Sequence, residues 1–391
     1  MSIPEKIKNN KYLALALLFT ILSMAAIFLF FGFQKYDDSP GYIYLIYWLQ
    51  GKEAGVDIAF NWIILGPMES LFAIPFQFLG EGAGIIVQNL LFYFFAAFLI
   101  FRIIQLIFNN KEQALWGTIL FVAALPMLQF GLSYMTDMGA WFFYILSVFL
   151  TLLYLKNRDE KLIIINGLLS SFGTLIKTNG GLGIVFFILM ILFSREFILK
   201  EKFLKMLKFG IPFLLPILAY QISLSVFFHT NVVKEYLGFD SFFLTQGVEE
   251  IKAFPGSVYA HLSKPVVIAY AYAGEFLKSF GIIGLLFALI GLWREWLQKS
   301  KERVKIYLAL LPASFAFLIF PPADSRLAFI STPLLILWAT QGLVYLKGVF
   351  SEKKGKLIIP ILITGYVFFN YYFQIVGSYR LIVFKLINLI K

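Results

Sequence analysis

Two adjacent carboxylates, Asp37 and Asp38, directly follow the first long apolar run, in the segment Gln-Lys-Tyr-Asp-Asp-Ser-Pro-Gly. The Ser, Pro and Gly residues favour a turn at this point. Because neighbouring carboxylates repel each other, one of them is suited to accept a proton as a general base, and the pair is suited to bind a metal ion. The alternative interpretation is a solvated loop whose acidic residue caps the next helix.

A third carboxylate, Asp137, occurs in Ser-Tyr-Met-Thr-Asp-Met at the start of another apolar run. Thr and Asp are common at helix N-termini, where they cap free backbone N–H groups and interact favourably with the helix dipole. That role explains Thr136 and Asp137 without any catalytic or binding function. In the alternative interpretation, Asp137 joins Asp37 and Asp38 in one site, because both loops would lie at the same membrane face.

A lysine, Lys177, lies in Ile-Lys-Thr-Asn-Gly-Gly-Leu-Gly between the apolar runs 162–176 and 180–193. Each run has roughly 15 residues and is about 22 Å long as a helix, which is shorter than the ~30 Å hydrocarbon core. The turn between them is therefore expected below the outer surface. A lysine at that depth either extends to the headgroups or has an anionic partner, and the glycines allow a ligand to approach the backbone.

A second cation, Arg326, lies in Asp-Ser-Arg-Leu-Ala-Phe-Ile near the end of another predicted span. Its planar guanidinium suits a phosphate, and Asp324 is the alternative partner. Three further residues are candidates to line the same cleft: Glu69, Tyr134 and Asn179. For Glu69 the alternative is a surface position on an interfacial helix. Because the sequence contains no cysteine, disulfides, thiolate metal sites and a cysteine nucleophile are excluded.

The composition indicates that these residues are positioned by membrane-spanning helices. Hydrophobic residues make up 60% of the 391 residues and charged residues only 14%, whereas about a quarter of a soluble domain is charged. No polar linker or repeat divides the chain, so residues 1–391 are interpreted as one domain. The first run, 12–33, is too long for a cleaved signal peptide and is expected to stay as an anchor. The net charge of +11 is attributed to membrane topology, with no nucleic-acid partner.

The sequence predicts an all-α, polytopic transmembrane helical bundle with about eleven spans. With the N-terminus in the cytoplasm, 22 of the 33 Lys and Arg residues lie inside and 11 outside, as the positive-inside rule requires. All the candidate site residues above then face the extracytoplasmic side of the cell membrane. The predicted spans are residues 12–33, 84–107, 114–132, 138–155, 161–177, 179–194, 209–228, 276–292, 304–320, 327–346 and 357–376.

Two long outer loops are predicted, at 34–83 and 229–275. In the first loop, segment 58–79 is apolar but contains Gly66, two prolines and Glu69, so it is interpreted as a re-entrant or interfacial helix. The Tyr- and Trp-rich segment 42–49 is interpreted as a second interfacial helix. The second loop is rich in aromatic residues, which suit either stacking on a sugar ring or contact with headgroups.

The distribution of charge also separates classes of function. The centres of the predicted spans are almost free of charge, which argues against a proton- or ion-coupled transporter but leaves a lipid-linked glycan flippase as an alternative. An O-antigen-type polymerase or ligase is a further alternative. Such an enzyme is expected to use arginines in a large outer loop, and loop 229–275 contains no arginine.

The ordered set of motifs resembles the GT-C superfamily of integral membrane glycosyltransferases. The matching features are an acidic pair after the first span, a long first outer loop with interfacial helices, Tyr-Met-Thr-Asp entering a span, a Lys-Thr-Asn-Gly turn, and a late Arg in Arg-Leu-Ala-Phe-Ile-Ser-Thr-Pro-Leu-Leu. The most similar group is the bacterial and archaeal enzymes related to protein mannosyltransferases and to the aminoarabinose transferases of lipid A. Those enzymes take a sugar from a polyprenyl-phosphate donor.

The resemblance implies a role for each motif residue. Asp37 or Asp38 would be the general base for an acceptor hydroxyl. Asp137 would support the site or, with Asp37, help to hold a divalent cation such as Mg, Mn or Ca where a family member uses one. Lys177 and Arg326 would bind the donor phosphate, and the sugar would be transferred with inversion.

The implied partners are a polyprenyl-phosphate-linked sugar donor, membrane lipids, and a glycan, lipid or protein acceptor. Two motifs depart from the family pattern. Arg326 is followed by Leu327 where Arg-Tyr is usual, and the acidic pair is Asp-Asp instead of Asp-Glu. The subfamily and the acceptor are therefore left open by the sequence.

Overall fold

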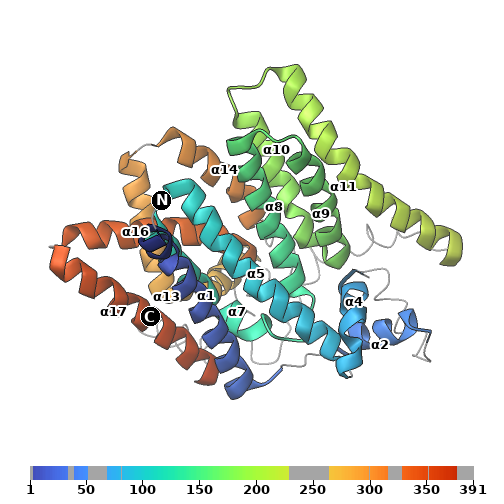
Figure 1. Cartoon of the computed structure of the whole chain (residues 1–391), viewed down its shortest axis with the longest axis horizontal. Coiled ribbons are helices and arrows are strands. Elements are labelled where there is room, and N and C mark those ends of the chain that lie inside the picture. The colour runs from blue at the N-terminus through green and yellow to red at the C-terminus, as the bar shows by residue number, and fades with distance from the viewer. Residues whose placement is uncertain are drawn as a thin grey trace. The chain divides into compact units, whose positions relative to one another are not determined.

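Every regular element that the computed structural model describes is a helix (Figure 1). The described residues are 3–33, 39–51, 68–80, 82–228, 264–298, 300–315, 328–350 and 352–376. Within these ranges, six helices are long and apolar enough to cross a membrane. The predicted all-α, multi-pass fold is thereby confirmed. The six candidate spans are Lys11–Phe30, Ala83–Phe108, Asp137–Asn157, Leu199–Val226, Phe276–Gln298 and Phe329–Val349.

Within the described residues, each predicted span overlaps a helix or a pair of helices, but several boundaries differ. The predicted span 114–132 is broken into two helices, with Pro126 in the first turn of the second, where its missing N–H is tolerated. Another helix begins at Lys264, ahead of the predicted 276. The helices with their bounds are α1 Ile3–Phe31, α5 Ala83–Phe108, α6 Lys111–Val122, α7 Leu125–Phe130, α8 Asp137–Asn157, α9 Lys161–Ile176, α10 Gly183–Phe193, α11 Leu199–Phe228, α13 Lys264–Gln298, α14 Lys301–Phe315, α16 Thr332–Val349 and α17 Glu352–Val376.

The chain divides into two compact units, and the first contains Met1–Thr118, Phe130–Val232 and Lys301–Ala313. In this unit α8 packs against α5, α9 and α10, and α9 packs against α11 (Figure 1). The antiparallel helices α8 and α9 are joined by buried polar side chains. Asn166 Nδ2 donates to Thr151 Oγ1 at 2.9 Å, and Ser170 Oγ donates to Ser147 Oγ at 3.0 Å. Interhelical hydrogen bonds of this kind fix one register between membrane helices.

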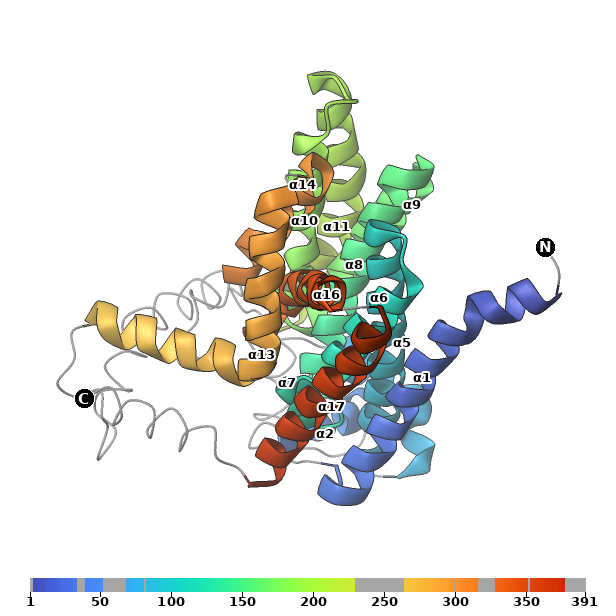
Figure 2. The ribbon, with the colours of Figure 1, turned by 90° about the vertical axis from the view of Figure 1, so that its left-hand side faces the viewer.

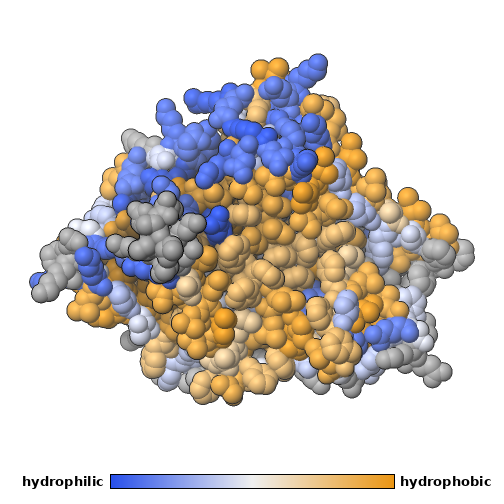
Figure 3. Space-filling view, viewed as in Figure 1, coloured by the Kyte–Doolittle hydropathy of each residue, from blue (hydrophilic) through white to orange (hydrophobic). Residues whose placement is uncertain are grey.

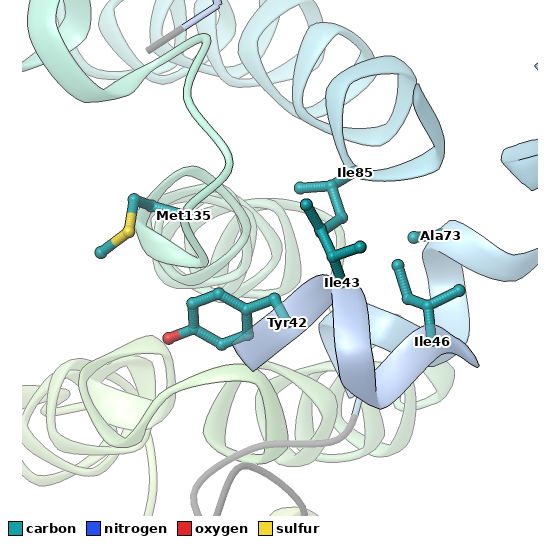
Figure 4. Packing of buried hydrophobic residues seen from close by; sticks show 6 residues of the cluster. All are labelled: Tyr42, Ile43, Ile46, Ala73, Ile85 and Met135. Atoms are coloured by element: carbon teal, nitrogen blue, oxygen red, sulfur yellow. The ribbon is translucent and has the colours of Figure 1, made fainter. Parts of the chain in front are cut away.

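The first predicted outer loop contributes α2 (Ser39–Leu49), α4 (Met68–Ala73) and the 3-10 helix η1 (Ile74–Leu79) to the same unit. The short helices therefore lie in the segments where interfacial helices are predicted. A buried cluster joins them to α5 and to the residues before α8 (Figure 4). Its members are Tyr42, Ile43, Ile46, Ala73, Ile85 and Met135.

Charged side chains gather at the end of this unit where α8 connects to α9 and α10 connects to α11, beside a broad apolar surface over α5 (Figure 3). There Lys205 Nζ contacts Glu160 at 2.8 Å and Lys208 Nζ contacts it at 3.2 Å. Arg158 pairs with Glu196. These connections are the ones that the charge distribution predicts on the cytoplasmic side.

The second unit comprises Ile119–Gln129, Val233–Ser300 and Ser314–Lys391. Gly281 has φ 70° and ψ 156°, and this left-handed residue separates two arms of α13 that meet at an angle (Figure 2). The second arm packs on α16, where a Cβ at Gly291 would lie 1.7 Å from the Trp338 carbonyl oxygen. In α17, Tyr366 donates a hydrogen bond to the Leu120 carbonyl. All of the sequence's candidate site residues that the structure describes belong to the first unit.

Candidate active site

Asp137 and Lys177 form a buried ion pair at one end of the α8–α9 hairpin. Asp137 is the first residue of α8, and Lys177 follows the last residue of α9, so the antiparallel packing brings the two positions together. Lys177 Nζ donates to Asp137 Oδ1 at 2.6 Å. The Asp137 side chain is fully buried, whereas 28% of the Lys177 side chain is exposed. The Lys177 side chain is therefore only partly covered by the described part of the protein.

The residues before α8 are held in place by neighbouring helices. Thr136 precedes α8 but makes no capping hydrogen bond with its side chain. The Thr136 hydroxyl instead lies 3.2 Å from the hydroxyl of Tyr42 on α2. The ring of Tyr42 extends from that helix in Figure 4. On α5, Asn89 Nδ2 donates to the carbonyl oxygens of Ser133 and Met135 at 2.8 and 2.9 Å. The start of α8 is thus positioned by tertiary contacts.

Glu69 on α4 brings a second carboxyl group close to the pair. A Cβ on Gly139 of α8 would lie 2.5 Å from Glu69 Oε2, so the glycine makes room for the carboxyl group. Among the described residues neither oxygen of Glu69 has a hydrogen bond of normal geometry. Burial raises the pKa of Glu69 to about 8. The nearby Gln88 amide lowers this pKa, the Asp137 carboxylate raises it further, and the Lys177 ammonium group lowers it. Glu69 is therefore largely protonated at neutral pH.

The other two cleft candidates lie beside the pair in sequence. Asn179 belongs to the 3-10 helix η2 (Thr178–Leu182) and is buried, and its side-chain amide has no hydrogen bond within the described part of the chain. Tyr134 is partly buried against the cluster of Figure 4, and its ring packs where a Cβ of Gly82 would lie. Both residues belong to the same compact unit as the ion pair.

Three predicted site residues, Asp37, Asp38 and Arg326, lie outside the described residues. Over the ranges that the structure does describe, no group of three His, Cys, Asp or Glu side chains could hold a metal ion. The carboxylate of Asp137 is neutralised by Lys177 in this arrangement. A divalent cation at Asp137 would therefore need further ligands, and Asp37 is the one that the sequence predicts.

Several supporting residues were not anticipated from the sequence. Gln88 and Asn89 are polar residues within an apolar span, and both are buried. Their importance could have been inferred from the sequence, because a buried polar group in a membrane helix needs a partner. The contacts of Tyr42 and Gly139 could not be inferred from the sequence, since interfacial tyrosines and glycines within membrane helices are both common.

The position of Lys177 depends on close packing of the turn that follows it against α8 and α9. A Cβ on Gly180 would lie 2.4 Å from the Gly173 carbonyl oxygen on α9 and 3.1 Å from Ala140 Cα on α8. We expect Gly180→Ala to displace the turn, to lower stability by about 1–3 kcal/mol and to weaken activity, although the ion pair residues are unchanged. Thermal unfolding and activity of the purified variant test this.

The matched control is Gly210→Ala, because a Cβ on Gly210 of α11 meets no atom within 4 Å. Alanine there is expected to keep or slightly raise stability, since it favours the helix. Equal melting temperatures for the Gly180 variant and the native protein would show that the turn is not packed as described.

Taken together, the site combines the ammonium group of a partly exposed lysine with two buried carboxyl groups. An ammonium group can bind an anion through its N–H donors, one of which Lys177 uses for Asp137 Oδ1. The buried carboxylate fixes the direction of the ammonium group. Such a site suits the recognition of a phosphate group near the surface of a membrane.

Comparison with known proteins finds one family model that matches part of the chain. A family model described as dolichyl-phosphate-mannose-protein mannosyltransferase matches residues 66–220. That range includes Glu69, Asp137 and Lys177. Comparison with curated protein sequences finds no match.

Among solved structures, the archaeal oligosaccharyltransferase AglB from Archaeoglobus fulgidus, in complex with an inhibitory peptide and a dolichol-phosphate, has a similar fold. The TM-score is 0.57 at 12% sequence identity. The match covers 95% of this chain and 56% of the other, so this chain spans little more than half the length of that protein. The matched family model, the shared fold and the ordered motifs all make the chain similar to the GT-C superfamily of integral membrane glycosyltransferases.

Proposed function

We propose that the protein transfers a sugar from a polyprenyl-phosphate donor to an acceptor hydroxyl on the extracytoplasmic face of the membrane, with inversion at the anomeric carbon. The ion pair of Asp137 and Lys177 carries this proposal, because it orients the ammonium group of a partly exposed lysine within the range that matches the mannosyltransferase model. The solved archaeal enzyme was captured with a dolichol-phosphate, which supports a lipid-phosphate donor here.

In the proposed reaction, one group of residues acts as the base and another binds the phosphate. Asp37 or Asp38 accepts the proton of the acceptor hydroxyl, and the oxygen attacks the anomeric carbon opposite the leaving group. The bond between that carbon and the phosphate oxygen breaks, and its electron pair leaves with the polyprenyl phosphate. Lys177 and Arg326 stabilise the negative charge on the phosphate. The acceptor is a glycan, lipid or protein that carries a free hydroxyl.

Sugar transfer by the purified protein in lipid tests the proposal. The protein is supplied with labelled polyprenyl-phosphate sugars and with extracted cell-envelope acceptors. Label on the acceptor is the expected result and also identifies the sugar. Label that crosses the bilayer while still attached to its lipid would support a flippase and contradict the proposal.

The phosphate role of the two cations predicts a specific kinetic defect. Lys177→Met and Arg326→Gln are each expected to raise the donor KM about ten- to hundredfold, because a hydrogen bond to a charged group contributes about 1.5–3 kcal/mol. Steady-state transfer at varied donor concentration measures the effect. Lys161→Met is the control, since Lys161 begins α9 at the opposite end of the hairpin. Unchanged donor KM in both variants would remove the phosphate assignment.

A further inference from the structure

The first ten residues of α11 extend beyond the length of helix that the hydrocarbon core of a membrane holds. α11 has 30 residues, Leu199–Phe228, and is therefore about 45 Å long. Residues 209–228 contain no Lys, Arg, Asp or Glu and by themselves match the ~30 Å hydrocarbon core. Residues 199–208 contain four lysines and one glutamate. The basic end of α11 therefore lies at the level of the lipid headgroups.

Exposed apolar side chains continue along α11 from the span into this basic end. Leu199 is 79% exposed and Phe203 is 60% exposed. Further exposed apolar residues follow every three or four positions, and they are Leu207, Ile211, Leu214, Leu218, Ile222 and Val226. This spacing places them on one face of the helix. Because the face is continuous, the lipid that covers the span also covers the first turns of α11.

The acids beside the start of α11 already have partners within the described part of the chain. The connections at 156–161 and 194–208 contain four acids. Glu160 and Glu196 form the ion pairs with lysine and arginine given above. Asp159 and Glu201 each accept a hydrogen bond from a nearby backbone N–H group. None of the four is left to attract a cation from outside the protein.

Two cations of the same region lack such partners. Arg195 and Lys200 are both exposed, and neither side chain makes a hydrogen bond or an ion pair within the residues that the structure describes. Phe203 and Leu204 lie three and four positions after Lys200, so they are its neighbours on the surface of α11. The Lys200 ammonium group is therefore attached to the exposed apolar face.

The connection that carries Arg195 is fixed against the α8–α9 hairpin. The ring of Phe197 lies 4.8 Å from the Arg158 guanidinium and 4.5 Å from Lys205 Nζ. Cations over an aromatic ring are attracted by its negative face. These contacts hold Arg195 close to the first turn of α11 before any ligand binds.

We propose that Arg195, Lys200 and the exposed apolar face at the start of α11 form a binding surface for an anionic phospholipid. The two cations bind the headgroup phosphate, and Leu199 and Phe203 contact the acyl chains. A zwitterionic lipid fits less well, because no acid of the region is free for its choline or ethanolamine group. The surface lies at the end of the α8–α9 hairpin opposite to the candidate active site, on the side predicted to be cytoplasmic.

Thermal unfolding of the purified protein in an uncharged detergent tests this surface. Short-chain phosphatidylglycerol should raise the melting temperature until the site is saturated, and short-chain phosphatidylcholine should not. Arg195→Gln and Lys200→Gln should each weaken the apparent affinity for phosphatidylglycerol about fivefold, and the double variant about twentyfold. Equal stabilisation by the two lipids, or native affinity in the double variant, would overturn the proposal.

Lys354→Gln is the matched control for Lys200→Gln. Lys354 is exposed at the start of α17, in another basic segment, and its variant should keep the native affinity. An equal loss in both variants would reduce the effect to net charge and overturn the proposal.

Two further measurements separate this surface from other anion sites. Glycerol phosphate, which has no acyl chains, should not raise the melting temperature at the same concentration. Equal stabilisation by it would show a site for soluble anions and contradict the proposal. Lys177→Met should keep the response to phosphatidylglycerol, whereas its loss would place the lipid at the candidate active site. No sugar takes part in these measurements, so failure of the proposed transfer is seen separately, as the absence of label on any acceptor.

Discussion

Replacing Asp137 by Asn is expected to lower sugar transfer by about a hundredfold or more, with the protein still inserted and folded. The carboxylate is fully buried and accepts the Lys177 hydrogen bond at 2.6 Å. Asn has nearly the same shape but no charge, so the ammonium group loses its counterion and the direction that the pair imposes on it. A displacement of about 1 Å in a catalytic site lowers rates to this extent. Transfer from a labelled polyprenyl-phosphate sugar measures the loss.

Asp159→Asn is the control for this change. Asp159 lies beyond the other end of α8, is exposed, and accepts a hydrogen bond from the Lys161 backbone N–H. Its variant should transfer at the native rate. Native activity in the Asp137 variant would show that the ion pair only stabilises the hairpin, and the phosphate site would then have to lie elsewhere.

The second large effect is expected at the acidic pair of the first outer loop. Asp37→Asn and Asp38→Asn are made singly, and at least one of them should lower transfer by about 10²–10⁴-fold, the usual contribution of a general base. The donor KM should change little, because the base acts on the acceptor hydroxyl. Transfer at saturating donor concentration separates this defect from the donor-binding defect predicted for Lys177.

Asp57→Asn is the matched control for the acidic pair, since Asp57 is an acid of the same loop outside the Asp-Asp motif. Loss of transfer in both Asp37 and Asp38 variants would indicate that the two carboxylates act together. Native transfer in both would eliminate the proposed base. Transfer by the two variants therefore decides whether Asp37 or Asp38 acts as the base.

The positions of the helices were predictable because they depend on the length and hydropathy of each run of residues, which can be read directly from the sequence. Apolar runs of sufficient length mark helices, and within the described residues each predicted span overlaps one or two of them. Six of the described helices are long and apolar enough to cross a membrane. The short runs on either side of Lys177 are indeed short helices, α9 and the pair η2 and α10. The boundaries were less accurate, since the extension of α13 from Lys264 and the break before Pro126 depend on local backbone geometry and packing.

The candidate site was predictable only as a set of residues. Composition and motif order selected Asp137, Lys177 and Glu69, but the sequence presented each one beside a simpler interpretation. For Asp137 that interpretation was a helix cap, and for Glu69 it was a surface position. The described structure instead pairs Asp137 with Lys177 and buries Glu69 completely.

The sequence by itself therefore determined the helical class, the helix positions and the charged residues worth considering. Only the tertiary structure decided which of those residues meet. Apolar length and residue type are local properties that a single segment expresses alone. Burial and pairing depend instead on which side chains face each other when α4, α5, α8 and α9 pack, and close contacts at Gly139 and Gly180 set that arrangement. A buried charge must then take the partner that packing provides.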